Sequence, residues 1–105
     1  MYVILTSKPG QFRTDPGAGL APVEHYDYLF CGRLKARFSI AELPADFSGL
    51  RILVTEEGDG AGPVPAVNRV PVKFLERFDS LERARRELEH MTKMGALDTA
   101  LVRRD

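Results

Sequence analysis

His25 and Asp27 are the residues of this chain whose types and spacing are best suited to acid–base chemistry. They lie in a dense run of titratable side chains that extends from Glu24 to Tyr28. Residues two apart in a strand project from the same face, so the Asp27 carboxylate would be able to orient the His25 imidazole. No nucleophile and no set of metal ligands accompanies the pair. The sequence therefore favours a polar strand entry near solvent, with acid–base catalysis as the alternative.

Three cations, Arg33, Lys35 and Arg37, alternate with apolar residues and form a second candidate site. In a strand such residues lie about 7 Å apart on one face, where they would bind an anion or the acidic surface of a partner protein. The alternative, which we favour, is a solvated outer face of a sheet, where Lys and Arg also discourage edge-to-edge pairing. Nucleic acids are bound by aromatic residues on the same face as the cations, whereas the aromatics here have the opposite parity. We therefore expect nucleic-acid binding to be weak or absent.

The cysteine and histidine content excludes several kinds of cofactor. The 105 residues include one cysteine, Cys31, and two histidines, His25 and His90. A single cysteine cannot form an internal disulfide, and these three residues are too few for a structural zinc site, a cysteine-ligated iron–sulfur cluster or a Rieske centre. We therefore predict no metal site and no cofactor.

The charge and hydropathy of the chain indicate whether it would bind nucleic acid or associate with a membrane. The 15 basic residues balance the 15 acidic ones, so the net charge of zero gives no overall attraction to nucleic acid or to anionic membranes. No segment approaches the roughly 20 apolar residues of a membrane span, and residues 1–8 lack the basic region of a signal peptide. We expect a cytoplasmic protein with no membrane segment, folded as a single domain over residues 1–105.

The basic row belongs to a stretch with period-two alternation, from Tyr26 to Ile40. This pattern predicts a strand that buries one face, which carries four aromatic rings. Fifteen residues of strand would extend about 50 Å, too far for a domain of this size. We therefore expect Gly32 to be a bend or bulge that divides the strand into two halves. A helix is the rival interpretation, because four apolar residues of the stretch also recur every four positions.

Further elements are predicted on both sides of this stretch. Two segments rich in Gly and Pro, 8–22 and 57–68, are expected to be long loops, which would rim a pocket if they leave the same end of the sheet. Runs of β-forming residues predict strands over 2–7, 50–56, 69–78 and 99–103.

One helix is predicted over about residues 79–94. Asp79 and Glu82 form a D-x-x-E capping arrangement at its start, and Gly95 is a suitable residue to follow its end. Apolar residues recur with helical spacing at Leu81, Ala84, Leu88 and Met91. Opposite charges four residues apart would pair on the solvent side: Glu82–Arg86, Arg85–Glu89 and Glu89–Lys93. The predicted fold is α+β: a mostly antiparallel sheet of about five strands, in the order β-β-β-β-α-β, with this C-terminal helix packed on one face.

Two stretches, VILTSKPGQFRT at residues 3–14 and YDYLFCGRLKARFSIAEL at residues 26–43, resemble small proteins labelled as ferredoxin subunits of aromatic ring-hydroxylating (phenylpropionate-type) dioxygenases. A Rieske ferredoxin carries Cys-x-His and a later Cys-x-x-His, and this sequence has neither motif. The resemblance therefore supplies no cluster ligands. It implies an accessory component of an oxygenase system that is not itself an electron carrier.

These observations lead to one favoured function and two alternatives. The favoured function is a non-enzymatic accessory or interaction subunit, which binds a protein partner or forms a homo-oligomer through its sheet face and loops. The first alternative is a small-molecule-binding protein or acid–base enzyme, with a pocket around His25 and Asp27 rimmed by loops 8–22 and 57–68. The second is weak binding of nucleic acid or another anion by Arg33, Lys35 and Arg37.

Overall fold

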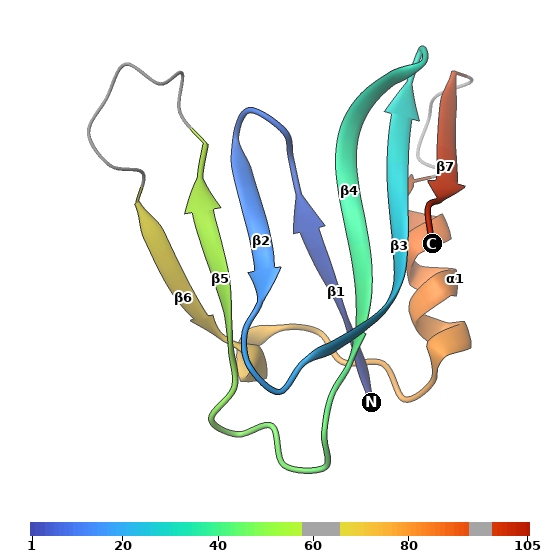
Figure 1. Cartoon of the computed structure of the whole chain (residues 1–105). Coiled ribbons are helices and arrows are strands. Elements are labelled where there is room, and N and C mark those ends of the chain that lie inside the picture. Colours follow the sequence, from blue (N-terminus) through green and yellow to red (C-terminus); the bar gives the residue numbers. More distant parts are fainter. Residues whose placement is uncertain (58–65, 93–97) are drawn as a thin grey trace.

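The computed structural model describes residues 1–57, 66–92 and 98–105 (Figure 1). The predicted α+β architecture, mostly antiparallel with one C-terminal α-helix, is confirmed, but the described residues form seven strands rather than about five. The elements are β1 (Tyr2–Ser7), β2 (Phe12–Pro16), β3 (Ala21–Phe30), β4 (Arg33–Glu42), β5 (Arg51–Glu56), β6 (Val67–Pro71), the 3₁₀ helix η1 (Val72–Phe74), α1 (Leu81–Thr92) and β7 (Thr99–Arg103).

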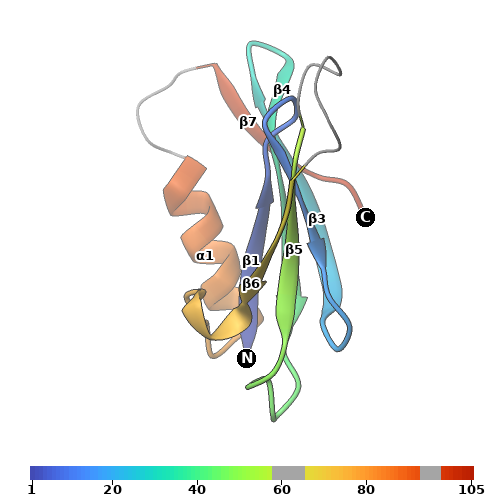
Figure 2. The same ribbon diagram turned by 90° about the vertical axis from the view of Figure 1, so that its left-hand side faces the viewer.

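The strands form two antiparallel sheets that lie side by side (Figure 1). The four-stranded sheet has the order β1-β4-β3-β7, and the three-stranded sheet has the order β2-β5-β6. Thr14 of β2 joins them, because its N–H donates to Ser7 Oγ at 2.9 Å and its hydroxyl donates to the carbonyl of Thr6 at 2.5 Å. Helix α1 covers one face of the four-stranded sheet (Figure 2).

The alternating stretch from Tyr26 to Ile40 is divided into two strands at Gly32 as predicted, but the division is a hairpin turn and not a bend or bulge within one strand. Cys31 and Gly32 both have left-handed backbones, with φ of 50° and 75°, and form a two-residue turn between β3 and β4. Both arms nevertheless keep the predicted parity, because Tyr26 lies opposite Phe38. The turn alone would invert the parity, since it places Phe30 opposite Arg33, but a register shift of one residue between Tyr28 and Leu29 restores it.

Two other predictions need correction. Segment 8–22 is not one long loop, since it contains β2 and the start of β3. The strand predicted over 69–78 ends at Pro71, and the next three residues form η1. Most of the loop predicted over 57–68 lies outside the described residues.

The hydrophobic core has two parts, one on each face of the four-stranded sheet. Residues of β4 that face α1 pack against the helix, in a cluster made of Ala36, Phe38, Ile40, Ala84 and Leu88. Residues of alternate parity pack on the opposite face and against the three-stranded sheet, in a cluster made of Val3, Leu5, Leu20, Ala41, Leu43, Ile52 and Val72. This division follows from the strict alternation of side chains along β1 and β4.

Helix α1 begins one residue later than its predicted cap implies. Ser80, not Asp79, caps the helix, because its hydroxyl accepts a hydrogen bond from the N–H of Arg83 at 3.1 Å. Asp79 instead lies 3.7 Å from Arg83 in an exposed ion pair. Of the predicted apolar stripe, Ala84 and Leu88 are fully buried. The predicted Gly95 position falls outside the described residues.

Candidate functional site

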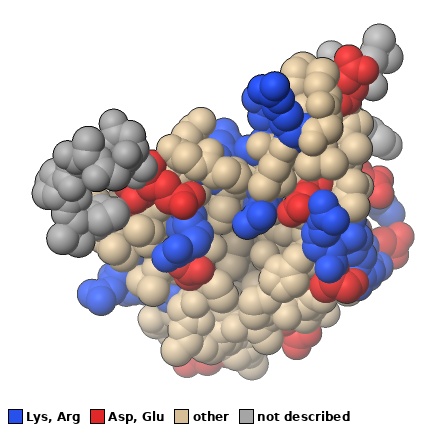
Figure 3. Space-filling view, turned by 45° about the horizontal axis from the view of Figure 1, so that its top comes forward, with Lys and Arg blue, Asp and Glu red and all other residues tan. Residues whose placement is uncertain are grey.

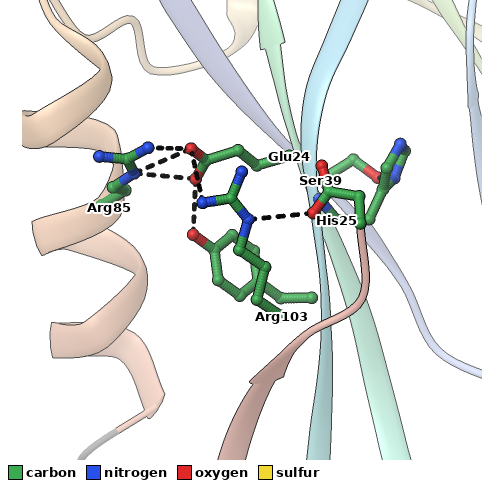
Figure 4. Close-up of polar contacts among 7 residues, drawn as sticks. Glu24, His25, Ser39, Arg85 and Arg103 are labelled. Carbon is green, nitrogen blue, oxygen red and sulfur yellow. Dashed lines mark hydrogen bonds and ion pairs between the residues drawn. The ribbon is translucent and has the colours of Figure 1, made fainter.

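A buried carboxylate joins α1 to the four-stranded sheet (Figure 4). Glu24 of β3 is 2% exposed and faces the helix. Arg85 donates from Nε to both carboxylate oxygens, at 2.9 and 3.0 Å, and also from Nη2. The Tyr26 hydroxyl donates to Oε1 at 2.5 Å, and Arg103 Nη1 lies 3.5 Å from Oε2. We call Glu24, Tyr26, Arg85 and Arg103 the Glu24 cluster.

Strand and helix geometry bring the members of the Glu24 cluster together. Glu24 and Tyr26 are two residues apart in β3, so both project toward α1. Arg103 of β7 lies opposite Tyr26 in the antiparallel register and therefore shares its face. Arg85 follows the fully buried Ala84, so the helix directs it along the same side of the sheet. The sequence analysis missed this cluster and instead paired Arg85 with Glu89.

The electrostatics of the Glu24 cluster favour an ionised carboxylate at neutral pH. Hydrogen bonds from Arg85 hold the pKa of Glu24 below its ordinary value, against the opposing effect of burial. Burial and the hydrogen bond to Glu24 raise the pKa of Tyr26, and the hydrogen bond to Glu24 raises the pKa of Arg85. A carboxylate that already accepts several charged and neutral donors is a poor general base. The cluster is therefore suited to joining α1, β3 and β7, and not to proton transfer.

His25 and Asp27 lie on the opposite face of β3 and have different partners. The exposed His25 ring places Nδ1 2.9 Å from Ser39 Oγ, and its backbone N–H donates to Asp105 Oδ1 at 3.2 Å (Figure 4). The Asp27 carboxylate accepts from Arg104 Nε at 2.7 Å and lies 3.6 Å from Arg37 Nε. The imidazole thus contacts Ser39 and not Asp27, so the orientation that the acid–base alternative required is not seen.

Ser39 is a residue that the sequence analysis missed. Hairpin formation places it opposite His25 in the β3–β4 register, at the distance of a nucleophile from its general base. The signal was available only through the hairpin, because the two residues are 14 apart in the chain. The pair lies on the sheet face that α1 does not cover.

The three cations of the predicted basic row differ in their surroundings. Arg37 pairs with Asp27, whereas Arg33 and Lys35 have no carboxylate partner among the described residues. Lys35 Nζ lies 5.8 Å from the ring centroid of Phe30, which is 41% exposed. Phe30 and Arg33 are opposite each other where the hairpin turns. Figure 3 shows basic side chains separated by other residues, and not one continuous basic surface.

Two hollows lie beside α1, away from His25 and Asp27. The larger has a volume of about 610 Å³ and is lined by helix residues that include Arg83, Arg86 and His90. The smaller, of about 150 Å³, adjoins β1. None of their lining residues belongs to segments 8–22 or 57–68. A pocket between those two segments stays a prediction, since residues 58–65 are outside the described part.

Within the described ranges, no group of three or more His, Cys, Asp or Glu side chains is placed to hold a metal ion. No helix in the described part of the chain has the length and apolar character needed to cross a membrane. No protein-family model, curated protein or solved structure matches the chain. The resemblance to dioxygenase ferredoxin subunits stays a prediction.

Proposed function

We propose that this protein is a non-enzymatic interaction domain that binds an acidic surface of a partner protein through the tip of its β3–β4 hairpin. The hairpin tip comprises Phe30, Cys31, Gly32, Arg33 and Lys35. The observation that carries the proposal is an exposed aromatic ring beside two cations that have no carboxylate partner among the described residues.

Several other cations are neutralised within the chain, although Lys73 also lies over an exposed ring, with its Nζ 5.5 Å from the centroid of Phe74. The described ion pairs include Arg13–Asp15, Arg83–Asp79, Arg86–Glu82 and Arg104–Asp27. In a chain with a net charge of zero, unpaired cations beside an exposed apolar ring are a local excess. A matching acidic surface would complete their electrostatic interactions and cover the ring.

The structure of the hairpin suits it to recognition. A two-residue turn between hydrogen-bonded strands holds the tip in one backbone conformation, so little conformational entropy is lost on binding. Aromatic residues and arginines are also the side chains that most often dominate interface energetics. A protein partner is favoured over nucleic acid because Tyr26, Tyr28 and Phe38 face α1 and leave Phe30 as the aromatic ring at the tip.

The unique thiol makes the proposal testable at the tip itself. Cys31 is exposed, so it can carry an environment-sensitive fluorophore. We expect poly-L-glutamate to change its emission with a salt-sensitive affinity, and Arg33→Glu combined with Lys35→Glu to weaken binding at least about tenfold. Arg51→Glu combined with Arg69→Glu is the matched control, because both residues are exposed and the charge change is the same.

Three results would count against the proposal. The absence of any titratable response to poly-L-glutamate would contradict an acidic partner. An equal loss of affinity in the control variant would show that net charge and not the hairpin tip governs binding. Stronger binding to an oligothymidylate of equal charge would favour nucleic acid over protein.

One observation favours a second candidate function, a hydrolytic enzyme. The Ser39 hydroxyl lies within hydrogen-bond reach of His25 Nδ1, as a nucleophile lies beside its base. Hydrolysis of p-nitrophenyl acetate that falls at least about tenfold in Ser39→Ala, but not in the exposed control Ser48→Ala, would support it. Equal rates in both variants would exclude this role.

A further inference from the structure

The outer edge of β7 is the least protected sheet edge among the described strands. Strand β6 ends at Pro71, which has no N–H to donate. The facing edges of β1 and β2 are joined through Thr14. Strand β7 contains no proline, pairs with β3 without a register shift, and has no strand beyond it in the described structure (Figure 1). Such an edge is a template for another strand.

The register shows which backbone groups point outward. Arg104 donates its N–H to the carbonyl of His25 at 2.8 Å, and the Asp98 carbonyl accepts from the N–H of Cys31 at 2.9 Å. Residues of an antiparallel strand alternate between facing the partner and facing away. Leu101 is an odd number of residues away from both Asp98 and Arg104, so its N–H and C=O point away from β3. The N–H and C=O of Arg103 point away from β3 for the same reason.

We propose that β7 pairs antiparallel with β7 of a second copy of this chain, about a two-fold axis at Leu101. The two Leu101 residues would then exchange a pair of N–H···O=C hydrogen bonds. The four-stranded sheets of the two copies would merge into one sheet of eight strands. This interface begins beside the hairpin tip, but it does not depend on the proposed function.

The side chains of β7 are complementary to themselves in this register. On the face away from α1, Asp98 lies opposite Arg104 of the second copy, and Ala100 lies opposite Val102 of the second copy. Both charged residues are exposed, and Arg104, which pairs with Asp27 within the chain, would be shared with Asp98 of the second copy. The two-fold axis repeats each pair. These are non-hydrogen-bonded positions, where facing side chains are closest. Two opposite-charge pairs would therefore flank an apolar centre.

A second copy fits this edge for a specific reason. Shifting the axis by one residue, to Val102, would place Arg104 opposite Ala100 and remove both charge pairs. Charge complementarity thus favours the register with its axis at Leu101. This complementarity arises from the sequence of β7 alone. A short edge without a large apolar area predicts a weak, concentration-dependent dimer.

Charge reversal tests both the partner and the register. In Asp98→Arg, two arginines face each other at each end of the interface, and in Arg104→Asp two aspartates do. We expect each variant alone to dimerise at least about tenfold more weakly than the wild-type chain in sedimentation equilibrium. An equimolar mixture of the two variants restores opposite charges at both ends, so it should form heterodimers with near wild-type affinity. Glu42→Arg and Arg69→Asp are matched controls on other strands.

A backbone variant covers the case in which charge changes disturb folding. Leu101→Pro removes the outward N–H without removing a hydrogen bond to β3, and its far-UV circular dichroism should resemble that of the wild-type chain. We expect this variant to be monomeric. The proposal is overturned if the wild-type chain is monomeric up to about 1 mM. It is also overturned if the dimer persists in Leu101→Pro, or if the mixture of charge variants does not associate.

Discussion

Replacing Glu24 with Gln tests whether the Glu24 cluster holds α1 on the four-stranded sheet. Glu24 is 2% exposed and accepts hydrogen bonds from Arg85 and Tyr26. Removing one partner of a fully buried ion pair costs about 3–5 kcal/mol. Arg85 and Arg103 are 43% and 49% exposed, so water can solvate them again in the variant. We therefore expect Glu24→Gln to lower the free energy of unfolding by about 2–3 kcal/mol.

The measurement is urea denaturation followed by far-UV circular dichroism at pH 7. Glu82→Gln is the matched control, since Glu82 pairs with Arg86 at 3.1 Å but their side chains are 79% and 72% exposed. Exposed pairs contribute little, so the control should change the free energy of unfolding by less than about 0.5 kcal/mol. If Glu24→Gln costs no more than the control, the cluster does not hold the helix and the reasoning fails.

The pH dependence separates ionisation from packing. Hydrogen bonds from Arg85 hold the pKa of Glu24 below 4.5, its ordinary value. A carboxyl group with a depressed folded pKa contributes stability above its unfolded pKa and loses it as pH falls through the folded pKa. The stability difference between wild type and Glu24→Gln should therefore be constant down to about pH 5 and shrink below pH 4.5. A difference that persists undiminished in acid would assign the effect to packing.

Two further predictions concern the same helix and its contact with the sheet. The pKa of Tyr26 is raised above 10.0 by burial and by the Glu24 carboxylate, so its contribution is complete below pH 10.0 and is lost as pH rises through the folded pKa. In thermal melts above pH 10.0, the stability of Tyr26→Phe should therefore fall less than that of the wild type. An equal fall in stability in the two proteins would contradict this prediction. Ser80→Ala should lower the free energy of unfolding by about 1 kcal/mol in urea, because the helix loses its cap. Asp79→Ala should lower the free energy of unfolding by less than Ser80→Ala does. A larger loss in Asp79→Ala than in Ser80→Ala would favour Asp79 as the cap.

The sequence predicted elements that depend on local patterns better than elements that depend on turns. The limits of β1 and β7 were correct because each is a short run of β-forming residues. The hairpin was missed for a geometric reason. A two-residue loop pairs residues of opposite parity, such as Phe30 with Arg33, but a register shift of one residue between Tyr28 and Leu29 restores equal parity, so the alternation continues as it would in one strand. Cys31-Gly32 also lacks the Asn-Gly or Asp-Gly signature of such turns.

The candidate site was harder to predict because its contacts join distant parts of the chain. Glu24 carried a usable signal, since it shares the parity of Tyr26 and Tyr28, which face the core. A charged residue at such a position needs a partner, but the sequence does not identify it. Arg85 is 61 residues away, and its helical neighbour Glu89 is an equally good partner by spacing alone.

The hairpin changes the meaning of the basic row. On one continuous strand, Arg33 and Lys35 would lie within a sheet face, several residues from either end. On the hairpin they flank a turn, and Arg33 lies directly opposite Phe30. The proposed β7 interface begins beside this turn, because the Asp98 carbonyl accepts the N–H of Cys31. A self-paired dimer would therefore carry two hairpin tips at opposite ends of its shared strand pair, where they would bind a repeated or extended acidic surface better than one tip alone.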